Sequence, residues 1–80
     1  MGGNSPIPFR KVKRAFSRGG AEHINTNGSH FVWVYLEQEV VIVVHKNQVK
    51  SYYINDARKQ WALTRYDGVS DKDFWDGNWS

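Results

Sequence analysis

The fold of this chain follows from residues 21–45, which read AEHINTNGSHFVWVYLEQEVVIVVH. Stretches rich in β-forming residues alternate here with short polar connections, and Asn27-Gly28 is a strong signal for a tight hairpin turn. We therefore expect strands over residues 21–26, 29–36 and 39–45, with Glu37-Gln38 as the second connection. Because both connections are short, the three strands are predicted to pair antiparallel.

Helical periodicity flanks this strand segment on both sides. Residues 8–18 place three apolar side chains on one helical face, Phe9, Val12 and Phe16, and the pair Gly19-Gly20 is typical of a helix end. Residues 48–63 place a second apolar set on one face, namely Val49, Tyr53, Ala57 and Trp61. Lys46-Asn47 breaks the chain between the third strand and this second helix.

The element order is α-β-β-β-α, which predicts a two-layer α+β domain over residues 8–63. Two helices would pack on one face of a three-stranded antiparallel sheet. We expect residues 1–7 to form a flexible leader. Residues 64–80 form an acidic, tryptophan-rich C-terminal extension that is able to pack on the domain. Within it, Ser70 and Asp73 resemble a capping box, so a short helical turn is expected over residues 70–76.

Strand 29–36 has two faces, and either could form the core. Phe31, Trp33 and Tyr35 share one parity, and aromatic side chains dominate small cores, so we expect this set to pack under the helices. The alternative is an exposed platform on which nucleic-acid bases stack. If the aromatic set is buried, the opposite face of the strand carries Val32, Val34 and Leu36 and needs cover. Either the tail, through Phe74, Trp75 and Trp79, or a protein partner could supply that cover.

Composition excludes several classes of chemistry. The 80 residues contain no cysteine, so disulfides, thiolate metal sites and cysteine nucleophiles are absent. The three histidines lack the spacing of a metal site, and we expect neither a metal nor another cofactor. No apolar run approaches the length of a membrane span, and no apolar leader indicates secretion, so a cytoplasmic protein without a membrane partner is expected.

The net charge of +3 conceals two basic segments, which predict a polyanionic partner. The first 20 residues hold five basic residues and no acidic one, and a second cluster follows the third strand. Charged helix faces that simply meet water are the alternative explanation. The residues that we expect to contact RNA phosphates are Arg10, Lys11, Arg14, Lys46 and Lys50.

The segment Asn27-Gly28-Ser29-His30, with Trp33 three residues later, resembles the Gly-Ser-His motif of HicA-type toxins. The surrounding order is similar over about residues 8–63: a basic first helix, a valine-rich strand ending at His45, and a basic second helix. This resemblance implies a fold like that of double-stranded-RNA-binding domains. It also implies a small ribonuclease that cleaves messenger RNA and is held inactive by a HicB-like antitoxin. His30 matches the family's catalytic histidine.

The chemistry of RNA agrees with this implication. RNA carries its own nucleophile, the 2′-hydroxyl, so a nuclease without metal needs a base, an acid and cations near the phosphate. Histidine can serve as either the base or the acid. His45 is open to two interpretations, a second titrating group or a solvent-exposed residue at a strand end. His23 receives no functional role.

Two functions therefore stand side by side. The first is a HicA-like endoribonuclease that depends on His30. The second is a non-catalytic RNA-binding module of the same fold, whose basic helices contact phosphates and whose affinity falls steeply with salt. The sequence predicts neither the RNA target nor the oligomeric state.

Overall fold

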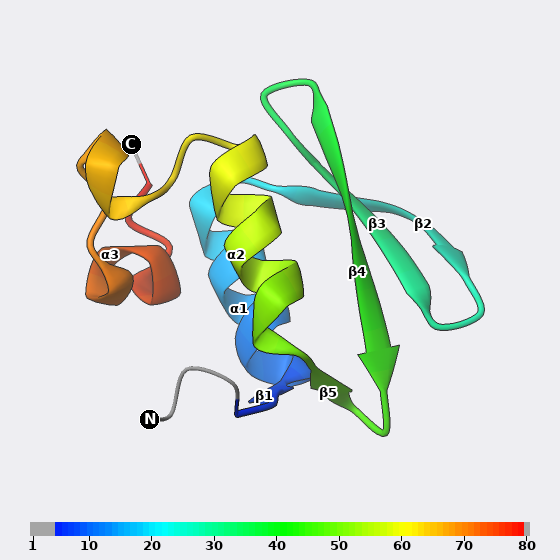
Figure 1. Ribbon diagram of the computed structural model, residues 1–80. Coiled ribbons are helices and arrows are strands. Elements are labelled where there is room, and N and C mark those ends of the chain that lie inside the picture. The colour runs from blue at the N-terminus through cyan, green and yellow to red at the C-terminus, as the bar shows by residue number, and fades with distance from the viewer. Residues whose placement is uncertain (1–4, 80) are drawn as a thin grey trace.

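The computed structural model describes residues 5–79 of the chain. Helices α1 and α2 lie side by side over one face of a twisted antiparallel sheet, and a shorter helical segment packs beside α1 (Figure 1). In chain order the elements are β1 (Ile7–Pro8), α1 (Phe9–Gly19), β2 (Glu22–Asn27), β3 (His30–Tyr35), β4 (Gln38–His45), β5 (Gln48–Val49), α2 (Ser51–Gln60), the 3₁₀ turn η1 (Arg65–Asp67) and α3 (Asp71–Asp76).

The sheet has five strands, in the order β1-β5-β4-β3-β2, and the prediction of three strands is wrong. The two additional strands are short and pair with each other, Ile7 with Val49 and Pro8 with Gln48. Two residues are too few to show an alternating pattern, so periodicity could not reveal them. The ordered pairing thus starts at Ile7, inside the expected leader, of which residues 1–4 lie outside the described part of the chain.

The second helix is shorter at both ends than its periodicity predicts. It spans Ser51–Gln60 rather than 48–63, because Gln48 and Val49 turn back as β5 after a tight turn at Lys46-Asn47. Val49 is fully buried, so its side chain belongs to the core, but the residue lies in strand β5 rather than in the helix. An apolar residue at helical spacing therefore does not by itself distinguish the first turn of a helix from a strand that precedes it.

The aromatic face of β3 packs beneath the helices, as the core interpretation predicts. Trp33 is 3% exposed and meets the ring of Phe16 edge-on at 5.2 Å. Phe31 and Tyr35 are half-buried against the same cluster; Phe31 lies 4.7 Å from Phe9, measured between ring centroids. These side chains are therefore unavailable as a platform for stacking bases.

The tail joins the core on the helix side of the sheet, so of the two covers that the sequence left open for the opposite face, the tail is excluded. Phe74 is fully buried, stacks on Trp79 with 5.4 Å between ring centroids, and contacts Phe16 of α1. The Trp79 ring can pack closely against α1 because Gly19 has no Cβ. A Cβ built on Gly19 would lie 2.1 Å from Trp79 Cδ2. The segment after α2 is thus part of one continuous core.

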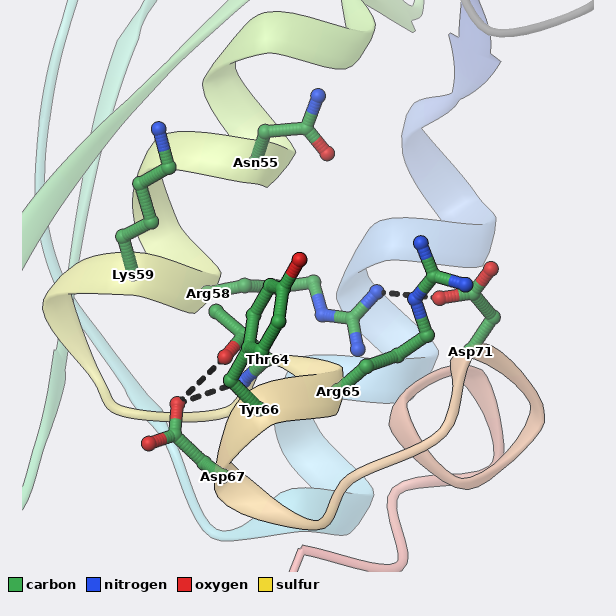
Figure 2. Close-up of a pocket in the computed structure, with 8 residues that line it drawn as sticks. All are labelled: Asn55, Arg58, Lys59, Thr64, Arg65, Tyr66, Asp67 and Asp71. Atoms are coloured by element: carbon green, nitrogen blue, oxygen red, sulfur yellow. Dashed lines mark hydrogen bonds and ion pairs between the residues drawn. The ribbon is translucent and has the colours of Figure 1, made fainter.

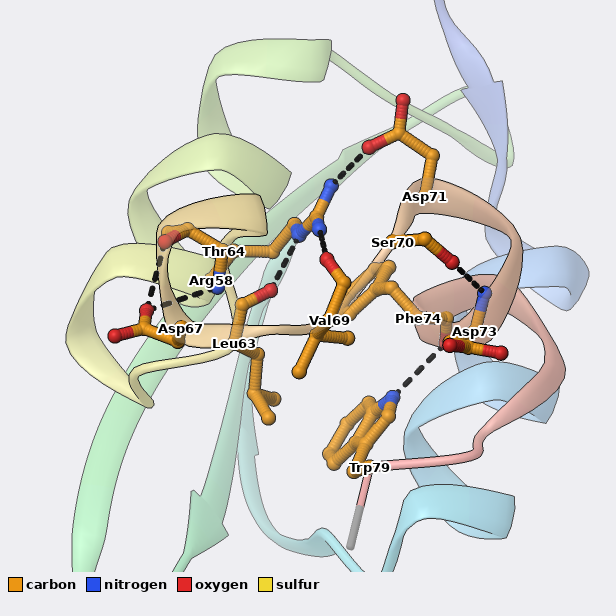
Figure 3. Close-up of polar contacts among 10 residues, drawn as sticks. All are labelled: Arg58, Leu63, Thr64, Asp67, Val69, Ser70, Asp71, Asp73, Phe74 and Trp79. Atoms are coloured by element: carbon orange, nitrogen blue, oxygen red, sulfur yellow. Dashed lines mark hydrogen bonds and ion pairs between the residues drawn. The ribbon is translucent and has the colours of Figure 1, made fainter.

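Polar contacts hold this tail in place (Figure 3). The guanidinium of Arg58 donates to the carbonyl oxygens of Leu63 and Val69, each at 2.8 Å, and pairs with the Asp71 carboxylate at 2.7 Å. The helical turn expected over residues 70–76 is present as α3, and the Ser70 hydroxyl accepts from the Asp73 N–H at 3.1 Å. Arg58 therefore serves the fold rather than a polyanion.

Candidate nucleic-acid interface

One face of the sheet is left uncovered by the helices and by the described part of the tail. Strand register determines which side chains point there, since residues opposite each other in an antiparallel pair share a face. Val34 lies opposite Glu39, Val32 opposite Val41, and His30 opposite Val43. The side chains of β3 and β4 on this uncovered face are His30, Val32, Val34, Glu39, Val41, Val43 and His45.

His30 is exposed at the first position of β3, directly after the β2–β3 turn. The turn consists of Gly28-Ser29, with positive φ only at Gly28, whereas the prediction centred it on Asn27-Gly28. A Cβ built on Gly28 would meet nothing within 4 Å, so the turn that precedes His30 is open to solvent. The Gly-Ser-His segment therefore presents its imidazole on a bare surface that a polynucleotide backbone can approach.

A cavity of 330 Å³ lies beside His30, beyond its cross-strand neighbour Val43. Val43 forms one wall of it, and the other lining residues are His45, Gln48, Lys50, Tyr52 and Tyr53. The two predicted phosphate contacts Lys46 and Lys50 are at this end of the sheet, because Lys46 follows His45 directly and Lys50 lines the cavity. The structure thus places His45 and Lys50 in one cavity, with Lys46 next to His45 along the chain and His30 across from the cavity residue Val43.

Tyr52 is a feature of this cavity that the sequence reasoning did not single out. Its side chain is half exposed, its ring lies 4.5 Å from that of Tyr53, and the Lys50 Nζ is 6.0 Å from its centroid. A hydrogen bond with Tyr52 raises the pKa of the Tyr53 hydroxyl. The sequence feature that could have indicated Tyr52 is a pair of adjacent tyrosines that follows a lysine at the start of a helix. A ring exposed beside cations is a surface on which a nucleobase can stack.

The three predicted phosphate contacts on α1 lie on the helix side of the sheet, apart from His30. Arg10, Lys11 and Arg14 line a cavity of 460 Å³ together with Pro8. The Lys11 ammonium also lies 4.7 Å from the ring centroid of Trp75. These cations therefore form a second basic surface on α1, which faces the tail.

The two basic surfaces meet at the end of the molecule where α1 begins. The Phe9 N–H donates to the Asn47 carbonyl oxygen at 2.9 Å, which joins the start of α1 to the β4–β5 turn. Arg10 and Lys13 line a further cavity of 370 Å³ with Asn47. Lys13, absent from the predicted set, thus extends the positive charge toward Lys46.

His23 packs against the aromatic face of β3 and is remote from the uncovered face. Its ring lies 5.4 Å from that of Phe31 and 5.3 Å from that of Trp33. Its Nε2 is 2.6 Å from the Thr26 hydroxyl oxygen. These contacts make it a packing residue at the free edge of the sheet.

A further cavity, of 620 Å³, lies between α2 and η1 (Figure 2). Its charges are already paired or mixed. The hydrogen bond from Arg58 holds the pKa of Asp71 below its ordinary value, and hydrogen bonds from Thr64 do the same for Asp67. Tyr66 points into solvent and is 98% exposed. Its lining carries three cations, Arg58, Lys59 and Arg65, against the two carboxylates Asp67 and Asp71, so its excess of positive charge is small.

Within residues 5–79, no group of three or more histidine, aspartate or glutamate side chains is arranged to hold a metal ion. In the same range, no helix has the length and apolar composition needed to cross a membrane. Comparisons of the chain with protein-family models, curated proteins and solved structures found no match.

Proposed function

We propose that this protein is a metal-independent endoribonuclease that cleaves messenger RNA in the cytoplasm, as the toxin of a HicA-like toxin–antitoxin pair. The observation that carries the proposal is the setting of His30. It stands exposed after a Gly-Ser turn that is open to solvent, next to a cavity that contains Lys50. The α-β-β-β-α order around it supports the likeness to double-stranded-RNA-binding domains.

RNA cleavage by this route requires only a few groups from the protein surface. The 2′-hydroxyl of RNA attacks the adjacent phosphorus once a base removes its proton, and a general base contributes about 10²–10⁴-fold to the rate. His30 supplies that base. Lys46 and Lys50 neutralise the phosphate and hold the backbone without reading its sequence. The proposal includes no metal and no cofactor.

A protein partner fits the remainder of the uncovered face. Val32, Val34, Val41 and Val43 form an apolar patch that adjoins His30 and that nothing in the described chain covers. Exposed apolar patches of this kind are typical of protein interaction sites. A HicB-like antitoxin that binds this patch would cover His30 as well, which is how the proposal accounts for inhibition.

The second candidate is a non-catalytic RNA-binding module. The specific observation in its favour is that Arg10, Lys11 and Arg14 form a basic surface on α1, away from His30. Such a surface binds phosphates without any contribution from a histidine. The two candidates therefore differ in whether His30 matters once RNA is bound.

The deciding experiment compares wild type with His30→Gln, which keeps a polar side chain of similar size on an exposed position. Both proteins are incubated with several RNAs in chelator at low salt, and their melting temperatures are compared. Cleavage by wild type that disappears in a folded His30→Gln supports the endoribonuclease. Salt-sensitive RNA binding by both, without cleavage, supports the binding module. Absence of RNA binding at low salt contradicts both.

A further inference from the structure

The register of β3 and β4 places a second histidine beside His30. The Val44 N–H donates to the Ser29 carbonyl oxygen at 2.8 Å, so His30 and Val43 form a pair that exchanges no ladder hydrogen bonds between themselves. Side chains are closest across such pairs. His45 is two residues beyond Val43 and therefore on the same face, diagonal to His30 at about 7–8 Å between backbone positions.

The turn residue nearest to both histidines carries no side chain. Continuing the register past Ser29 and Val44 brings Gly28 opposite His45. Gly28 has no side chain, and a Cβ built on it would have no neighbour within 4 Å. Two exposed histidines on one face at this separation can contact a phosphodiester group from opposite sides of phosphorus.

The surroundings of the two histidines differ in one respect that bears on their roles: a cavity adjoins His45, where a leaving nucleoside can be held. His45 lines the 330 Å³ cavity, in which the charged or titratable groups are Lys50 from the start of α2 and the two tyrosines Tyr52 and Tyr53. Lys46 adjoins His45 along the chain, and Gln48 faces it from β5. His30 pairs with Asn27 on β2 and with Val43 on β4, and both of these side chains are neutral.

We propose that His45 is the general acid of the reaction and that the cavity beside it holds the nucleoside on the 3′ side of the bond that breaks. His30 takes the 2′-hydroxyl proton while the bond from O2′ to phosphorus forms. The bond from phosphorus to O5′ breaks, and His45 donates its proton to that oxygen. The products are a 2′,3′-cyclic phosphate and a 5′-hydroxyl. The reaction is balanced without metal, water or another co-reactant.

Tyr52 completes this assignment. Its half-exposed ring lies in the same cavity as His45 and provides a flat surface for the base of the departing nucleoside. Because stacking affects binding rather than proton transfer, Tyr52→Ala is expected to raise KM with little change in kcat, while Tyr52→Phe keeps wild-type KM. His45→Ala is expected to lower kcat.

This inference rests on the proposed endoribonuclease function, and a sulfur-substituted substrate tests it separately. The bond that wild type cleaves is first mapped on ordinary RNA. The same RNA is then made with sulfur in place of the bridging 5′ oxygen at that bond. A thiolate leaves without protonation, so loss of a general acid is harmless on this substrate, whereas loss of the base is not.

On ordinary RNA, we expect both His30→Ala and His45→Ala to lose about 10²–10⁴-fold in rate. On the sulfur-bridged RNA, His45→Ala is expected to recover to within about tenfold of wild type, while His30→Ala stays slow. His23→Ala, at the free edge of the sheet and remote from the uncovered face, is the matched histidine control with wild-type rates. Melting temperatures establish that each variant is folded.

The possible failures are distinguishable. If wild type cleaves and His45→Ala cleaves ordinary RNA equally well, the role of His45 is wrong and the endoribonuclease stands. If His45→Ala is equally slow on both substrates, His45 acts in another way and the assignment as acid is overturned. If wild type cleaves no RNA, the proposed function and this inference fall together.

Discussion

Three buried tryptophans differ in what their indole N–H groups meet, and this sets how firmly each is held. Trp61 Nε1 donates to the Gln38 carbonyl oxygen at 2.9 Å, which ties the end of α2 to the start of β4. Trp79 Nε1 donates to the Phe74 carbonyl oxygen at 2.9 Å. Trp33 Nε1 is buried with no partner in the described chain. Trp61 and Trp79 are therefore anchored by polar contacts, while Trp33 is held by packing alone.

Gly19 is the residue on which the docking of the tail depends. Alanine normally stabilises a helix relative to glycine by up to about 1 kcal/mol. At position 19 a Cβ would overlap the Trp79 ring, so we expect Gly19→Ala to lower the free energy of unfolding by about 1–3 kcal/mol. Urea titration followed by tryptophan fluorescence measures the change. Ser17→Ala, exposed on the same helix, is the control; a stabilised Gly19→Ala would contradict the packing of Trp79.

Among the elements, the β3–β4 hairpin has the least favourable turn chemistry. Its turn consists of Leu36 and Glu37, whose φ values are 49° and 67°. Side chains with a Cβ are strained in this region, by roughly 1–2 kcal/mol for each residue. The prediction placed this connection at Glu37-Gln38, one residue later, because no glycine or asparagine marks the turn. The strands on both sides hold the turn in a conformation that its own residues disfavour.

Relieving this strain should stabilise the protein. Replacing Leu36 and Glu37 together, as Leu36→Asn with Glu37→Gly, introduces the pair that most readily adopts positive φ at both positions. We expect the free energy of unfolding to rise by about 1–2 kcal/mol in denaturant titration.

Leu36→Ala serves as the comparison for this pair, since it removes the apolar side chain without changing the need for positive φ. The exposed Leu36 side chain is worth little to the core, so Leu36→Ala should stay within about 0.5 kcal/mol of wild type. Equal stability of the double variant and wild type would show that the turn is not strained.

At the scale of the whole molecule, positive charge lies on two surfaces joined at one end. The first, on α1, contains Arg10, Lys11 and Arg14 on the helix side of the sheet. The second adjoins the uncovered face through Lys46 and Lys50. An RNA long enough to reach around the start of α1 can contact both. Only the second surface lies near His30, so the two should contribute differently to binding and to cleavage.

This difference is measurable through the salt dependence of RNA binding. Each phosphate contact that is removed lowers the slope of log affinity against log salt by about 0.7–1. We expect the double variants Arg10→Ala/Arg14→Ala and Lys46→Ala/Lys50→Ala to lower the slope by similar amounts. The Lys46/Lys50 variant should in addition slow the cleavage of saturating RNA.

Lys59→Ala is the control for these charge changes, because Lys59 lines the separate cavity between α2 and η1. For Lys59→Ala, the slope of log RNA affinity against log salt should match that of wild type. A Lys59→Ala variant that weakens binding as much as either double variant would mean that RNA contacts are spread over the whole surface rather than over these two regions.

Local patterns were enough to predict β3, α1 and the start of α3. The alternation along β3, the apolar spacing of α1 and the Ser70 cap each depend on residues a few positions apart. They can therefore be predicted without knowledge of the tertiary structure. The same holds for the exposed His30 at the start of its strand. These patterns do not predict which side chains distant in sequence come into contact.

Long-range packing settled the remainder. The pairing of β1 with β5, the docking of Trp79 against Gly19 and the use of Arg58 to hold the tail each join segments distant in sequence. Their free energies arise only when the chain is compact, because contact area and shape complementarity exist only between packed surfaces. The cavity beside His45 belongs to the same class, since its walls come from β4, β5 and α2. The apolar face of the sheet stays uncovered for the same reason: the aromatic residues of the tail reach a better-packed position among the helices.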